Sequence, residues 1–245
     1  MKYKGNLINS NSIQELICYY GDKEFSSPYR STIPLIELFF RNKSILEKII
    51  PNIQKYECVF EYETKVQKGS GKASCTDLMV FNEDYAFCIE AKRTEPAYQT
   101  VKEWLSLGNI ENRKQVLTGW LEIINKTCMT SLNFTDVGNL PYQMIHRFAS
   151  ACKITKKSEL LYFCFETDEK LTTYYEDELH KLAKLSNRKV PIKLVIFKIT
   201  ESETFKRLEN DWSSRSGNLD LSDEVQQLLI EEKIMDIEIA KIKEF

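Results

Sequence analysis

Apolar and polar residues follow two different periods along the chain. Spacings of three to four residues predict helices at 12–20, at 31–50, at 96–126 as one or two helices, and at 173–186. The second helix opens near Pro34 and ends at Pro51, and the segment 96–126 breaks at Gly108 and Asn109. The helices therefore lie both before and after the segments with strand patterns.

Strand patterns occupy the remaining apolar stretches. Alternation of polar and apolar residues predicts a half-buried strand at 55–66, and two further strands are expected at 74–81 and 85–92. The most apolar runs, at 159–167 and 190–200, predict buried strands with a helix between them. This order predicts an α/β fold, with a mixed central β-sheet flanked by helices.

Composition narrows the class of protein. The chain has 245 residues, of which 42% are apolar, which is enough for a large core. It has no apolar run of the roughly 18 residues that a membrane span needs, and "MKYKGNLINSNS" lacks the apolar stretch of a secretory signal. We therefore expect a cytoplasmic protein without membrane association. The seven cysteines form no CxxC pair and the two histidines are isolated, which argues against a zinc site.

Charge is unevenly distributed between the two parts of the chain. Residues 219–245 carry eight acids and three lysines, net −5, so residues 1–218 carry +3 of the overall −2. Apolar positions repeat through 221–242, which predicts an acidic amphipathic C-terminal helix (219–245) appended to a domain at 1–218. The apolar face of this helix is expected either to form a homodimer contact or to pack on the sheet of its own subunit.

Any site for a polyanion must be a local basic patch, because the net charge is close to zero. The candidate residues are Lys65, Lys68, Lys72, Arg113, Lys114, the stretch 153–157 and the stretch 181–189. Each of them is equally compatible with an ordinary solvated surface.

The two strands at 74–81 and 85–92 carry charged residues where strand cores are expected. With a period of two, Asp77 shares a face with Met79, and Glu90 shares a face with Lys92. A two-residue turn at 83–84 would bring Asp77 directly opposite Glu90, with Cβ atoms about 5 Å apart. Two carboxylates at this distance raise each other's pKa unless a cation lies between them. The arrangement predicts a site for a hard divalent ion such as Mg²⁺.

Asp77 followed by Glu90-Ala91-Lys92 at the end of the next strand resembles the D…(D/E)xK signature of the PD-(D/E)XK nuclease superfamily. The order of helix, three-stranded meander, helix and strand is also similar over roughly the first 170 residues. The resemblance implies a restriction-endonuclease-like core. Thr76 stands where the signature often has proline, which is a departure from the pattern.

The resemblance also implies an activity and a set of site residues. Asp77, Glu90 and the Ala91 carbonyl would hold Mg²⁺, for which Mn²⁺ can substitute, and Lys92 would act on the attacking water and the phosphate. Glu37 and Gln115 match an acid on the first core helix and a glutamine on the helix after the lysine. The implied protein is a DNA endonuclease of a prokaryotic or mobile-element defence, restriction or repair system.

The tripeptide acid-x-Lys is not specific by itself. It occurs at 63–65, 90–92, 168–170 and 231–233, and the hairpin context separates the second occurrence from the others. Two alternatives stay open: a nuclease-like module that binds nucleic acid or partners without cutting, and a scaffold in which Asp77, Glu90 and Lys92 form a solvated strand face.

Overall fold

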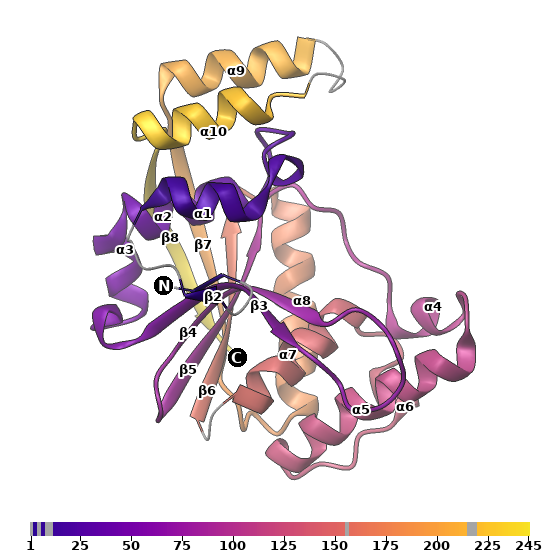
Figure 1. Cartoon of the computed structure of the whole chain (residues 1–245). Coiled ribbons are helices and arrows are strands. Elements are labelled where there is room, and N and C mark those ends of the chain that lie inside the picture. The colour runs from indigo at the N-terminus through magenta and orange to yellow at the C-terminus, as the bar shows by residue number, and fades with distance from the viewer. Residues whose placement is uncertain (1, 4–5, 8–11, 155–156, 215–219) are drawn as a thin grey trace.

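A mixed β-sheet with helices on both faces forms the centre of the molecule (Figure 1). The computed structural model describes residues 2–3, 6–7, 12–154, 157–214 and 220–245, with 2–3 and 6–7 described by their backbone alone. The strands are β1 (Lys2–Tyr3), β2 (Asn6–Leu7), β3 (Glu57–Thr64), β4 (Ser74–Phe81), β5 (Tyr85–Lys92), β6 (Lys157–Phe165), β7 (Ile192–Glu201) and β8 (Met235–Glu244). Their order across the sheet is β2-β1-β3-β4-β5-β6-β7-β8.

The sheet combines an antiparallel meander with a parallel section. Strands β3, β4 and β5 pair antiparallel, β5, β6 and β7 pair parallel, and β8 returns antiparallel to β7. The predicted α/β class with a mixed sheet is therefore confirmed.

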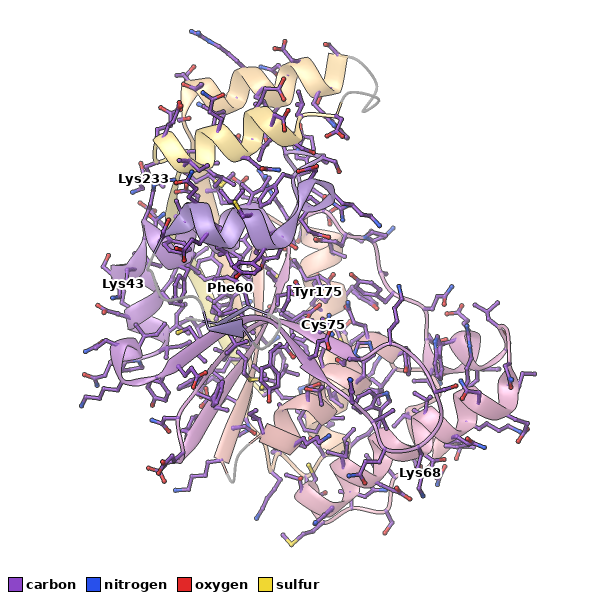
Figure 2. The ribbon with its side chains drawn as sticks, in the orientation of Figure 1. Lys43, Phe60, Lys68, Cys75, Tyr175 and Lys233 are labelled. Carbon is purple, nitrogen blue, oxygen red and sulfur yellow. The ribbon has the colours of Figure 1, made fainter. Side chains whose placement is uncertain are left out.

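Helices cover the two faces of the sheet in two groups. The helices are α1 (Ile13–Tyr20), α2 (Thr32–Phe40), α3 (Lys43–Ile49), α4 (Val101–Leu105), α5 (Ile110–Cys128), α6 (Phe134–Val137), α7 (Tyr142–Ile154), α8 (Glu169–Leu185), α9 (Glu203–Ser214) and α10 (Ser222–Glu231), with short 3₁₀ turns η1 (Asp22–Glu24) and η2 (Ile53–Lys55). Helices α1, α2, α3, α9 and α10 bury one apolar core and α5, α7 and α8 bury the other. Figure 2 labels one buried side chain of each core, Phe60 and Tyr175. No helix in the described part of the chain is long and apolar enough to cross a bilayer.

The hairpin of β4 and β5 has the predicted bounds and turn. Asn82 donates its backbone N–H to the carbonyl of Tyr85 at 3.0 Å, which closes a two-residue loop of Glu83 and Asp84. Asn82 Oδ1 also accepts from the backbone N–H groups of Asp84 and Tyr85, both at 2.9 Å. A turn fixed by its own asparagine sets the register of the two strands.

The segment 31–50 forms two helices rather than the single predicted helix. The break lies at Asn42, whose side-chain amide donates to the carbonyls of Glu37 at 3.2 Å and of Met235 at 3.1 Å. An asparagine side chain that bonds to backbone carbonyls competes with the helical pattern. The contact with Met235 is tertiary, so the break could not be seen in the local apolar pattern.

The predicted C-terminal helix over 221–242 is wrong beyond Glu231. Residues 235–244 form β8, in which buried Met235 and Ile237 alternate with exposed residues and pair with β7. The same apolar positions fit both a helix and a strand, and the unpaired edge of β7 decides between them. Val225 and Leu229 of α10 are buried in the core of their own chain, so this apolar face is not free for the predicted homodimer contact.

Candidate active site

Asp77 and Glu90 lie at the end of the β4–β5 hairpin, where the two strands stop pairing. The last opposed pair is Leu78 and Ile89, so the next step along the hairpin brings Asp77 beside Glu90. The backbone N–H of Ala91 donates to Asp77 Oδ2 at 2.7 Å. The Asp77 side chain therefore ties the two strands together beyond their paired register.

Two cations neutralise Glu90. Lys92 donates from Nζ to Glu90 Oε1 at 2.6 Å, and Arg147 donates from Nε to Glu90 Oε2. Arg147 Nη2 also lies 3.9 Å from Asp77 Oδ1. These four residues are named the carboxylate–cation cluster. The side chains of Glu90 and Lys92 are 1% and 3% exposed, whereas that of Asp77 is 21% exposed, so a ligand from solvent reaches the cluster first at Asp77.

Arg147 is the member of the cluster that the sequence analysis missed. It comes from α7, a helix that the apolar patterns did not predict, and it lies among the buried residues Met144, Phe148 and Ala151 of that helix. An arginine on an apolar helix face needs a buried anionic partner. That position was the signal in the sequence that pointed to a buried carboxylate.

The two carboxyl groups have pKa shifts of opposite sign. Burial raises the pKa of Glu90, but attraction to Arg147 and Lys92 outweighs burial and lowers it below the ordinary value. Burial and then repulsion from Glu90 raise the pKa of Asp77 well above its ordinary value. Burial lowers the pKa of Lys92, but attraction to Glu90 and Asp77 raises it well above its ordinary value. Glu90 therefore carries the negative charge, and Lys92 is an ammonium group.

Neighbouring polar side chains hold the two cations in position. Arg147 donates from Nη1 to Ser74 Oγ at 2.9 Å, and Ser74 Oγ lies 2.8 Å from His146 Nδ1. Burial and the charges of Arg147 and Lys92 lower the pKa of His146 well below its ordinary value, so the imidazole is neutral. Lys92 donates also to the Tyr98 hydroxyl at 3.3 Å. The cluster is thus fixed from β4, α7 and the segment after β5.

Two further residues, Glu37 and Gln115, were expected at the site. Glu37 is buried on α2, where it pairs with Arg41 at 2.6 Å, and α2 covers the opposite face of the sheet from the cluster. Gln115 is exposed on α5. The structure therefore separates Glu37 from the cluster, because a helix can follow in the expected order and still pack on the other face of the sheet. The role of Gln115 stays a prediction.

The oxygen donors of the cluster fit a hard divalent cation. Asp77 and Glu90 offer two carboxylates, and the Ala91 carbonyl points to the same strand edge as the Ala91 N–H that meets Asp77. The guanidinium of Arg147 contacts both carboxylates, so it must move from Asp77 for a metal to bind both. Among the described residues, no group of three or more His, Cys, Asp or Glu side chains has a metal-binding arrangement.

Of the predicted basic residues, Lys72 before β4 and Arg113 of α5 line the same pocket. The loop between β3 and β4 is fastened to α5, because Asn112 accepts from the Ser70 N–H and donates to the Ser70 carbonyl, both at 2.7 Å. Lys68 of this loop, labelled in Figure 2, pairs with Glu122 of α5. Residues 155 and 156 of the basic stretch 153–157 lie outside the described residues.

A second buried charge cluster lies at the carboxyl ends of β5 and β7. Arg93 donates from Nη2 to Glu201 and, at 3.2 Å, to Glu209 of α9. One guanidinium faces two carboxyl groups, and burial followed by the hydrogen bond and charge of Glu201 raises the pKa of Glu209 to about 8. This cluster links α9 to the sheet and is separate from Asp77 and Glu90.

Glu209→Gln should stabilise the protein at pH 8 and change little near pH 4.5. The unfolded chain releases the Glu209 proton near its ordinary pKa of 4.5, whereas the folded chain keeps it to about 8, so stability falls as the pH rises between these values. The neutral amide of glutamine does not titrate, so at pH 8 the free energy of unfolding should rise by on the order of 1 kcal/mol. Thermal unfolding from pH 4.5 to 8 measures it, with Asp211→Asn, exposed on the same helix, as the control. Equal pH slopes for wild type and Glu209→Gln would contradict the assignment.

The fold and site define a class of α/β protein with a buried carboxylate–cation cluster at the end of an antiparallel hairpin. The chain belongs to a family described as "Domain of unknown function (DUF6946)", whose model matches residues 9–206. A search of the curated proteins and a search of the solved structures found no match.

Proposed function

We propose that the protein is a metal-dependent nuclease that hydrolyses phosphodiester bonds in DNA. The observation that carries the proposal is the hairpin end, where Asp77, Glu90 and Lys92 meet on one sheet face and Asp77 is partly exposed. The resemblance of these residues to the PD-(D/E)XK signature supports it. The substrate phosphate is expected at the exposed side of Asp77.

The metal-holding carboxylates Asp77 and Glu90 and the cation Lys92 have separate roles in this proposal. Asp77, Glu90 and the Ala91 carbonyl would hold Mg²⁺ or Mn²⁺. When bound, such an ion neutralises charge on the phosphate and lowers the pKa of water. Lys92 stays protonated beside Glu90, so it orients the attacking water and stabilises negative charge instead of taking a proton.

A second candidate function is a nuclease-like module that binds nucleic acid without cutting it. The observation that favours this alternative is Arg147, whose guanidinium bonds to Glu90 and lies 3.9 Å from Asp77. A cation in this position neutralises the carboxylates without a metal. The two candidates differ in whether Mg²⁺ displaces the guanidinium from Asp77.

Cleavage of plasmid and linear DNA with Mg²⁺ or Mn²⁺, compared with EDTA, tests the proposal. We expect products that depend on the metal. DNA that stays intact with either ion, together with DNA binding in EDTA, would favour the non-cutting module.

Asp77→Asn should remove cleavage and weaken metal binding while the metal-free protein keeps or gains stability. The pKa of Asp77 is raised in the folded chain, so its ionised form costs stability at neutral pH, and a neutral amide relieves that cost while still accepting from Ala91. Calorimetry in EDTA and titration with Mn²⁺ measure the two effects. Asp84→Asn, exposed in the turn of the same hairpin, is the control. Wild-type metal affinity in Asp77→Asn would contradict a shared metal site.

A further inference from the structure

A pocket of about 360 Å³ lies beside the carboxylate–cation cluster. Its walls come from α4, α5, α7 and the end of the loop between β3 and β4. None of the roles proposed above uses it. Its size is within the range of small-molecule sites in proteins.

Aromatic rings form one wall of the pocket. Trp104 and Tyr142 stack with ring centroids 3.6 Å apart and planes 7° apart. The Tyr142 hydroxyl accepts from Trp120 Nε1 at 3.3 Å, and the ring of His146 lies 5.0 Å from that of Tyr142. Trp120 is buried and the other three rings are half-buried, and Tyr142 and Arg113 lie on the Trp104 ring. These contacts hold the rings in place, and such a wall suits edge-to-face contact with a flat aromatic ligand.

Cations line the same pocket, and none of the described residues in its lining is acidic. Arg113 lies over the Trp104 ring at 4.9 Å and donates to the Trp104 carbonyl, so its position is fixed. Lys72 contributes a second positive charge from the loop that Asn112 fastens to α5. A pocket with aromatic and cationic walls matches a base that carries a phosphate.

The pocket and the carboxylate–cation cluster share a wall. Ser74 and His146 line the pocket, and the Ser74 hydroxyl accepts the Arg147 hydrogen bond at 2.9 Å. Arg147 in turn bonds to Glu90. Ser74 therefore lies between a ligand in the pocket and the Arg147 guanidinium. The pocket and the cluster are close enough for adjacent parts of one nucleic-acid strand to occupy both.

We propose that this pocket binds an unpaired nucleobase, so that the protein acts on single-stranded DNA or on unpaired ends. This inference deepens the proposed function and rests on it for the identity of the ligand. Bases inside a duplex are stacked on each other and cannot enter a pocket, whereas bases of a single strand stack readily on protein aromatic rings. Arg113 and Lys72 hold the neighbouring phosphates.

Binding in EDTA tests the pocket without depending on cleavage. Fluorescence anisotropy with a labelled 20-nucleotide thymidine strand, a blunt duplex and a strand of abasic sites should give at least tenfold tighter binding of the thymidine strand than of the other two. Trp104→Ala should weaken thymidine-strand binding about tenfold and leave duplex binding unchanged. Leu107→Ala, an exposed apolar residue after α4, is the matched control.

The outcomes separate the pocket from the nuclease proposal. Equal wild-type affinity for the thymidine strand and the abasic strand would overturn the pocket, and this comparison needs no variant that could misfold. Unchanged thymidine-strand binding in a folded Trp104→Ala would overturn it as well. Preference for the thymidine strand without metal-dependent cleavage would support the pocket and reject the nuclease. Metal-dependent cleavage without this preference would support the nuclease and reject the pocket.

Discussion

Lys92→Met should reduce DNA cleavage at least a hundredfold while nucleic-acid binding in EDTA stays close to that of wild type. The Lys92 ammonium is 3% exposed, bonds to Glu90 at 2.6 Å and is the cation expected to act on the water and the phosphate. Removing one group that stabilises charge in a transition state typically costs a factor of 10² to 10³ in rate, or about 3 to 4 kcal/mol. Single-turnover cleavage with saturating Mg²⁺ measures the chemical step directly.

A matched lysine serves as the control for this result. Lys170 ends another acid-x-Lys tripeptide, at 168–170, and is exposed on α8. Lys170→Met should therefore leave cleavage unchanged. Because Arg147 still neutralises Glu90 in Lys92→Met, the variant should fold, and its unfolding midpoint checks this. Turnover by folded Lys92→Met above a few per cent of wild type would reject the assigned role of Lys92.

Local pattern was enough to predict the hairpin and the neighbouring charges of Asp77, Glu90 and Lys92. A two-residue turn fixes the register of adjacent strands, and register fixes which residues share a face. The break at Gly108 was equally local, since Gly108 has φ +60° and Asn109 caps α5 through the Asn112 N–H.

Tertiary pairing decided what the sequence could not predict. The segment 235–244 is a strand because the edge of β7 lies beside it, although its apolar spacing fits a helix as well. Arg147 reaches Glu90 from 57 residues away, and only the packing of α7 against the sheet brings them together. Packing also separates Glu37 from the cluster, because its helix, α2, lies on the other face of the sheet.

Arg147→Met should lower the free energy of unfolding in EDTA by about 3 kcal/mol at pH 7, as expected when one partner of a buried ion pair is removed. The variant leaves Glu90 in the interior with Lys92 as its remaining cation, and it also removes the charge near Asp77. Urea unfolding measures the loss. Arg207→Met, exposed on α9, is the control and should change stability by less than about 0.5 kcal/mol.

The pH dependence and a double variant identify Glu90 as the cause of this loss. The pKa of Glu90 is lowered in the folded chain, so its contribution to stability is present above its ordinary pKa of 4.5 and is lost as the pH falls through the folded value. The difference between Arg147→Met and wild type should therefore shrink below about pH 4.5. Combining Arg147→Met with Glu90→Gln should cost less than the sum of the two single changes, because both remove the same contact. Strict additivity, or a loss that is independent of pH, would show that Arg147 acts through packing instead of through Glu90.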